Sequence, residues 1–216
     1  MIREISIQSI FTNDVALKEK YKTFNLSTYC VGEYFVRLLG KFKIGKIQKL
    51  VIECDENPIT KITSYEDYSV QNVRRHINMN EYLELSGLDK KKWVLEIIVT
   101  AFEELKNYFE FSIDEIYLIA DEIKKANYQN NYKLANSILN KSKEHSANLY
   151  VEFNVEDFCL FLEIYDKNNI RTKFVKIKKV EPNFANNFMF CKIKWIDDKT
   201  IEVIGFDKKQ IKKVSL

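Results

Sequence analysis

Histidine is the usual general base of enzymes, and this sequence contains only two. His145 lies in the stretch SKEHSA at the end of a predicted helix, where it would interact with the helix dipole and need no catalytic role. His76 directly follows Arg74 and Arg75 in the stretch VRRHIN. These three side chains could hold a phosphate group or an acidic partner, but adjacent arginines are also common on solvated surfaces. We therefore treat Arg74, Arg75 and His76 as candidate binding residues.

The patterns that usually mark a catalytic or metal centre do not occur in the sequence. It has no HExxH motif, no closely spaced cysteine pair, no GxSxG motif and no glycine-rich phosphate loop. Its cysteines lie far apart with no histidine nearby, which favours free thiols in a reducing cytoplasm: Cys30, Cys54, Cys159 and Cys191. We therefore expect no catalytic residues, no metal and no cofactor.

Carboxylates give one alternative to this expectation. Metal-dependent nucleases place acids and a lysine at strand ends, where they hold Mg²⁺ and orient water. Glu163 or Glu181, together with the run DDK at 197–199, could take those positions. The same run is also good turn chemistry between two strands, so a nuclease is the least favoured of the alternatives.

A short repeat is the most unusual feature of the sequence: FVKIKKV at 174–180 is echoed by FCKIKWI at 190–196. Side chains alternate along a strand, so a hairpin of the two copies would bring their even-numbered residues onto one face. Aromatic rings interleaved with lysines on a sheet can stack bases and bind phosphates. The candidate partner-binding residues on this face are Phe174, Lys176, Lys178, Phe188, Phe190, Lys192 and Lys194.

The lysine face has two other interpretations. Residues 147–166 contain five acids and no base, whereas residues 167–216 contain thirteen bases and five acids. Acids on neighbouring strands, among them Glu163 and Glu202, could therefore neutralise lysines that keep the face solvated and discourage edge pairing. The phenylalanines fit a solvated face poorly, and they favour a contact with a partner protein or cover by the chain's own helices.

The hydrophobic patterns predict an α+β protein with N-terminal strands, a central group of about three helices and a C-terminal antiparallel meander of about five strands. Strands are expected at 2–11, 33–39, 47–54 and 70–77, with a short helix at 14–21 and an otherwise irregular segment at 60–84. Helices are expected at 89–109, at 112–126 behind a Ser112–Glu115 capping box, and at 131–144. The meander strands are expected at 148–154, 158–165, 170–180, 188–196 and 200–206.

Length and composition are those of one folded domain. Hydrophobic residues make up 46% of the 216 residues, and the formal net charge is only +3. We expect a single domain over 1–216, with a strand-rich, irregular part at 1–84 and a part at 85–216, containing the helices and the C-terminal sheet, as its alternative subdivision. No apolar stretch is long enough to cross a membrane, and the first residues do not resemble a signal peptide, so we expect a cytoplasmic protein.

In general character the chain is similar to the immunity proteins that neutralise bacterial toxins. This similarity lies in the α+β pattern and the lack of catalytic motifs, and it involves no specific residues. It implies a bacterial, non-enzymatic cytoplasmic protein whose partner is another protein, a cognate toxin. A nucleic-acid-binding module is the first alternative, and the sequence leaves the oligomeric state open.

Overall fold

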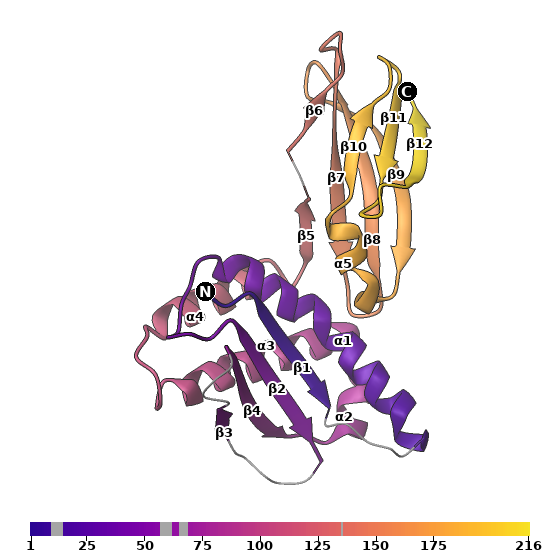
Figure 1. Cartoon of the computed structure of the whole chain (residues 1–216). Coiled ribbons are helices and arrows are strands. Elements are labelled where there is room, and N and C mark those ends of the chain that lie inside the picture. The colour runs from indigo at the N-terminus through magenta and orange to yellow at the C-terminus, as the bar shows by residue number, and fades with distance from the viewer. Residues whose placement is uncertain (10–14, 57–61, 65–68, 135) are drawn as a thin grey trace. The chain divides into compact units, whose positions relative to one another are not determined.

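The computed structural model describes residues 1–9, 15–56, 62–64, 69–134 and 136–216. It divides the chain into two compact units, Met1–Gln129 and Asn130–Leu216, which are considered separately below. The described elements confirm the predicted α+β class, with helices grouped in the first unit and antiparallel sheets in the second (Figure 1). No helix of the described part is long and apolar enough to span a membrane. The single-domain expectation stays a prediction, and all the long helices group with the N-terminal strands instead of the C-terminal sheet.

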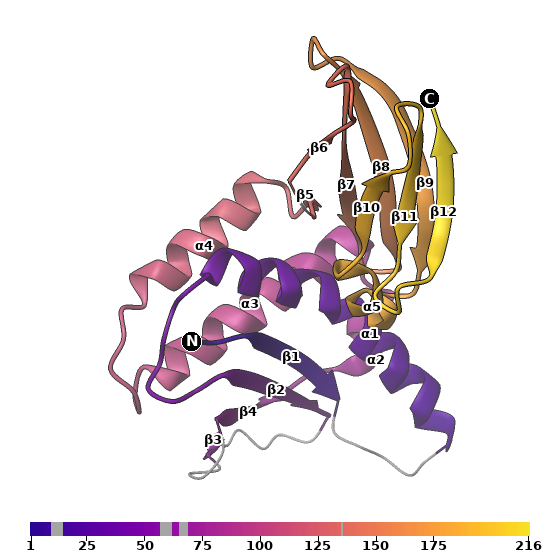
Figure 2. The ribbon, with the colours of Figure 1, turned by 45° about the horizontal axis from the view of Figure 1, so that its top comes forward.

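A four-stranded sheet of order β1-β2-β4-β3 forms the centre of the first unit. Its first three strands are parallel, and its last is antiparallel to β4: β1 (Glu4–Ser9), β2 (Lys49–Asp55), β4 (Val70–His76) and β3 (Ile62–Ser64). Figure 2 shows long helices on one side of this sheet. The helices of the unit are α1 (Val15–Leu39), α2 (Met79–Glu84), α3 (Gly87–Leu105) and α4 (Asp114–Lys125).

The two faces of this sheet differ in polarity because side chains alternate along each strand. The face toward the helices is apolar and buried, with Ile7, Leu50 and Ile52 almost inaccessible to solvent. The opposite face carries ion pairs, including a 2.7 Å contact between Lys49 and Glu4 on the neighbouring strand.

Helix α1 lies along the outer edge of β1. Thr28 Oγ1 donates to the carbonyl of Ile7 at 2.9 Å, and the amide of Ser9 donates to Asn25 Oδ1 at 2.7 Å. Gly32 allows the close approach, since a Cβ there would lie 3.0 Å from a carbonyl oxygen of β1. The helix thus satisfies edge groups that would otherwise be open to another strand.

The second unit consists of two antiparallel sheets. The larger sheet has the order β5-β7-β8-β9, with β6 also paired to β7: β5 (Asn130–Lys133), β6 (Ile138–Leu139), β7 (His145–Phe153), β8 (Phe158–Asp166) and β9 (Arg171–Val180). The smaller sheet contains β10 (Lys192–Trp195), β11 (Thr200–Ile204) and β12 (Gln210–Ser215). The turn η1 (Pro182–Phe184) and the short helix α5 (Asn186–Met189) connect β9 to β10.

Side chains join the edges of these two sheets. Trp195 Nε1 donates to the carbonyl of Ile138 at 3.1 Å, and Lys212 Nζ donates to the carbonyl of Lys176 at 2.9 Å. The core of the unit is strongly apolar, and Leu160 on β8 is completely buried within it.

Several elements differ from the sequence prediction: the strand expected at 188–196 is shortened to β10 by α5, the Ser112–Glu115 capping box is not formed at α4, and two elements are of another type. Residues 33–39 were predicted as a strand but form the last turns of α1, because their apolar side chains also fit one face of a helix that began at Val15. The third helix predicted at 131–144 is wrong, since these residues contribute β5 and β6, which both pair with β7. The predicted 60–84 segment lies partly outside the described residues, and its described part contains β4 and α2.

Candidate functional site

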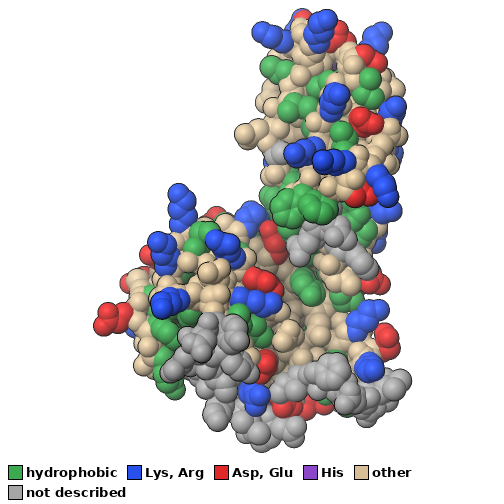
Figure 3. All heavy atoms as spheres, viewed as in Figure 1, with side chains coloured by type: hydrophobic (Ala, Val, Ile, Leu, Met, Phe, Trp, Pro, Cys, Tyr) green, Lys and Arg blue, Asp and Glu red, His purple; other side chains and the backbone are tan. Residues whose placement is uncertain are grey.

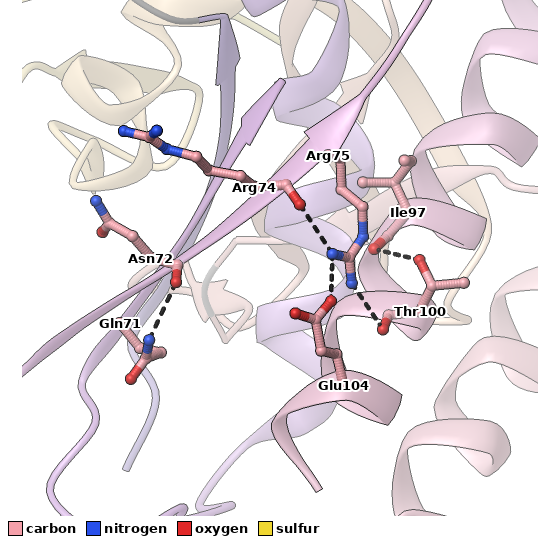
Figure 4. Close-up of polar contacts among 7 residues, drawn as sticks. All are labelled: Gln71, Asn72, Arg74, Arg75, Ile97, Thr100 and Glu104. Atoms are coloured by element: carbon pink, nitrogen blue, oxygen red, sulfur yellow. Dashed lines mark hydrogen bonds and ion pairs between the residues drawn. The ribbon is translucent and has the colours of Figure 1, made fainter. Parts of the chain in front are cut away.

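Arg75, one of the predicted binding residues, connects the sheet of the first unit to α3. Its guanidinium donates to the carboxylate of Glu104, to the carbonyl of Thr100 at 3.0 Å and to its neighbour's carbonyl at 2.9 Å (Figure 4). The Arg75 side chain is only 13% exposed. These contacts give it a structural role between β4 and α3.

Arg74 and His76 lie beside Arg75 on the same strand but have different surroundings. Arg74 Nε donates to Glu53 Oε2 at 3.0 Å. The Arg74 side chain points away from α3, on the opposite side of β4 from Arg75 (Figure 4). His76 is the last residue of β4 and is exposed. The predicted trio is therefore adjacent, but its two guanidinium groups are directed to internal carboxylates.

The predicted hairpin between the two sequence repeats is wrong. Strand β9 pairs with β8 in the larger sheet, whereas β10 pairs with β11 in the smaller one. Pro182 is the first residue of η1, a position that suits the fixed backbone angle of proline. Helix α5 follows and leads the chain into the other sheet. Consequently the phenylalanines and lysines of the two copies do not form one continuous face.

A β-bulge also divides the first copy. Lys176 lies opposite Phe161 and Lys178 lies opposite Leu160. Because Phe161 and Leu160 are consecutive, their side chains point to opposite faces of the sheet, and the two lysines do so as well. Simple alternation predicted both lysines on one face, and the bulge is the reason that this failed.

Phe174 belongs to a stack on the outer face of the larger sheet. Its ring is nearly parallel to that of Phe161, with centroids 4.5 Å apart, and the Arg171 guanidinium carbon lies 4.6 Å from the Phe174 centroid. Arg171 also donates to Glu163, which is only 3% exposed, at 2.9 Å. Since Phe161 covers one face of the Phe174 ring, Arg171 occupies the other, and a base could stack there only by displacing the guanidinium.

Lys192 and Lys194 lie exposed on β10. Lys194 is directly opposite Glu202 of β11, and Lys213 of β12 is opposite the same glutamate. The expectation that Glu202 shares a face with these lysines is confirmed by this register.

Phe188 and Lys178 line a groove at one end of the second unit. The groove has a volume of about 470 Å³, and the turn between β11 and β12 and the start of β12 supply its other residues: Gly205, Phe206, Asp207, Lys209, Gln210 and Ile211. Phe188 also stacks against the buried ring of Phe158, with centroids 6.4 Å apart. It is thus partly a core residue.

Phe190 and Phe206 form the most exposed aromatic pair in the described part of this unit. Their side chains are 64% and 70% exposed, and their ring centroids are 5.9 Å apart. On the face in Figure 3, hydrophobic side chains gather beside α5. Sequence reasoning identified Phe190 but missed Phe206, although an aromatic residue inside the turn sequence GFDKK was a signal of an exposed ring.

Three of the carboxylates considered for a nuclease have structural partners: Glu163, Asp197 and Asp198. Asp197 Oδ1 accepts from the amide of Lys199 at 2.8 Å, and this hydrogen bond is the main reason that the Asp197 pKa is lowered. Asp198 Oδ1 accepts from the amide of Ser142 at 2.8 Å. The Asp197 contact is local turn chemistry, whereas the Asp198 contact joins this turn to the loop between β6 and β7. Within the described ranges no three His, Cys, Asp or Glu side chains group as a metal site would require.

All four cysteines are free and buried. Burial raises the pKa of the Cys30 thiol and of the Cys54 thiol to about 12 in each case, so neither forms a thiolate near neutral pH. In this conformation they act as small core residues.

The fold and the surface together define an α+β chain with an exposed aromatic pair beside a groove that has lysines at its border. No family model matches this sequence, and comparisons with curated proteins and with solved structures found no similar protein.

Proposed function

We propose that this chain is a non-enzymatic protein-binding module of the immunity type, which neutralises a toxin in the cytoplasm by direct binding. The single observation that carries the proposal is the exposed pair of Phe190 and Phe206. Aromatic side chains supply much of the binding energy of protein interfaces. Exposing two such rings side by side in water is unfavourable unless a partner covers them.

A protein partner fits this surface better than a nucleic acid does. The aromatic rings that could stack bases are divided between separate places, since Phe174 already lies between Phe161 and Arg171. The lysines of β10 lie in a different sheet from those of β9, and Lys194 is opposite Glu202. An apolar pair next to a groove offers instead the anchor and the pocket of a protein interface.

A growth-rescue experiment tests the proposal. The chain is used to capture its partner from the native cell, and the identified partner is then expressed alone in a bacterial host. We expect this partner to arrest growth and co-expression of the wild-type chain to restore it. The double variant Phe190→Ala/Phe206→Ala should bind the partner at least about thirtyfold more weakly, since the loss of even one hot-spot aromatic costs roughly 2 kcal/mol or more, and it should fail to restore growth.

Leu139→Ala is the matched control for this experiment. Leu139 is also an exposed apolar residue of the second unit, but it lies on β6, at the other end of the larger sheet. This variant should restore growth as well as the wild type. A harmless partner, or equal rescue by the aromatic double variant and the wild type, would contradict the proposal.

A further inference from the structure

We propose that the groove beside Phe206 recognises an acidic segment of the partner that inserts one large apolar side chain. This inference rests on the proposed function, because it assumes that the partner is a protein. It adds the chemistry of the bound segment, and it follows from the shape, the charge and the rigidity of the groove.

The groove has an apolar interior of suitable size. The rings of Phe188 and Phe206 and the side chain of Ile211 line it, and its volume of about 470 Å³ is within the range of sites that bind small ligands. Gly205 lies close against this wall, since a Cβ there would lie 3.4 Å from Ile211 and 3.0 Å from Asp207. A single large apolar side chain of a partner could therefore be buried here.

The border of the groove is basic. Lys178 and Lys209 line it and Lys208 is exposed in the same turn, whereas Asp207 is the acid of this turn. Three lysines against one aspartate leave a local charge of +2. Asp207 pairs with Lys209 at 3.6 Å, and none of the described ion pairs involves Lys178 or Lys208. Carboxylates that flank the inserted side chain would complement these charges.

The turn that forms one wall of the groove is held in place by its own hydrogen bonds. Gly205 N donates to the carbonyl of Lys209 at 2.8 Å, and Lys208 N donates to the carbonyl of Gly205 at 3.0 Å. Asp207 Oδ1 also accepts from the amide of Lys209 at 3.1 Å. A wall that is already ordered reduces the conformational entropy lost on binding.

Titration with defined peptides tests this inference on the full chain. The acidic probe is acetyl-Glu-Asp-Trp-Asp-Glu-amide. Its controls are a peptide with Lys and Arg in place of the acids and an acidic peptide with Ala in place of Trp. Binding is followed by ¹H–¹⁵N NMR, which also locates the site. The acidic Trp peptide should shift the amide signals of residues 205–211 and bind more weakly as salt is added, since salt screens exposed charges.

Two variants separate the apolar and the charged contributions. Phe206→Ala should remove the shifts produced by the acidic Trp peptide. Lys178→Glu/Lys209→Glu should weaken its binding roughly tenfold, because two attractive charges become repulsive. Both positions are exposed, and unchanged NMR signals outside the groove would confirm that the variants remain folded.

The possible outcomes decide between this inference and the proposed function. Equal binding of the basic peptide, binding that does not require Trp, shifts located elsewhere, or no binding would each overturn the acidic-segment inference. Growth rescue that depends on Phe206 would still support the proposed function in any of those cases. Conversely, binding of the acidic Trp peptide at 205–211 with no growth-arresting partner would support the inference about the groove and contradict the toxin-neutralising role.

Discussion

Replacing Arg75 by methionine is expected to destabilise the first unit much more than the same change at Arg74. Arg75 is almost buried and holds β4 to α3 through Glu104 and the carbonyl of Thr100. Hydrogen bonds to charged groups contribute about 1.5–3 kcal/mol each, and removing one partner of a buried ion pair costs about 3–5 kcal/mol. Glu104 is 23% exposed and can regain some hydration, so we expect a cost just below the range for a fully buried pair, about 2–3 kcal/mol.

The matched variant Arg74→Met should cost at most about 1 kcal/mol, because this guanidinium is 35% exposed and its pair is close to a surface ion pair. The two tryptophans make the measurement specific, since Trp93 lies in the first unit and Trp195 in the second. Urea unfolding in a Trp195→Phe background therefore reports the free energy of unfolding around Trp93. In thermal unfolding the Arg75→Met transition should move down by about 5–10 °C.

A double variant tests whether the unpaired charge is the cause of the loss. Arg75→Met/Glu104→Leu removes both charges, so it should be more stable than Arg75→Met alone, as apolar replacement of a buried pair often is. Equal urea midpoints for Arg75→Met and Arg74→Met would contradict a structural role specific to Arg75. A double variant no more stable than Arg75→Met would show that the unpaired charge of Glu104 is not the cause of the loss.

Three further predictions concern packing, thiol reactivity and pH. Gly32→Ala should destabilise the first unit by about 1–3 kcal/mol in urea unfolding, because its Cβ would meet a carbonyl of β1 at 3.0 Å, whereas Gly87→Ala, with no atom within 4 Å of its Cβ, should not. The four buried cysteines should react slowly with a thiol reagent at neutral pH and rapidly in denaturant; fast labelling of the native chain would contradict their burial. Burial raises the pKa of Asp157, but the hydrogen bond and charge of Lys179 outweigh it and lower the pKa below the ordinary value of 3.8. Asp157 therefore stabilises the folded chain above pH 3.8, and this contribution is lost as the pH falls below that value. The free energy of unfolding of Asp157→Asn, followed by Trp195 fluorescence, should therefore decrease less than that of the wild type as the pH falls through this range.

Local patterns in the sequence were sufficient for several elements. Two strand-forming runs separated by the turn residues at 166–169 predicted β8 and β9 as antiparallel strands, and the structure pairs them directly. The apolar face of 89–109 predicted a helix, and α3 covers Gly87–Leu105. Helix α3 could be predicted because its helical periodicity is strong, and β8 and β9 because local turn residues separate two short strand-forming runs.

Tertiary contacts decided the elements that the sequence did not predict. EYFVRLL fits a strand and a helix equally well by hydrophobicity, and it is helical because α1 continues along the edge of β1 through Thr28 and Asn25. Residues 130–133 form a strand because β7 offers an edge for them, which lies well beyond any local window. The pairing of residues 130–133 with β7 could not be read from local hydrophobic periodicity, which is why a third helix was predicted there.

The sequence repeat shows why similar strands can have different roles. The copies alternate only in part: Ile177 and Cys191 are buried and Lys176 and Lys192 are exposed, but the bulge in β9 breaks the alternation of the first copy after Ile177. Their pairing partners are set by η1 and α5, which place the second copy in another sheet, and by the bulge, which turns Lys178 toward the groove. The phenylalanines then separate in function, because Phe174 stacks between Phe161 and Arg171 whereas Phe190 lies exposed beside a turn that sequence reasoning had not considered. A binding surface that consists of one residue from a repeat and one from a distant turn can be recognised only once the connections between strands are known.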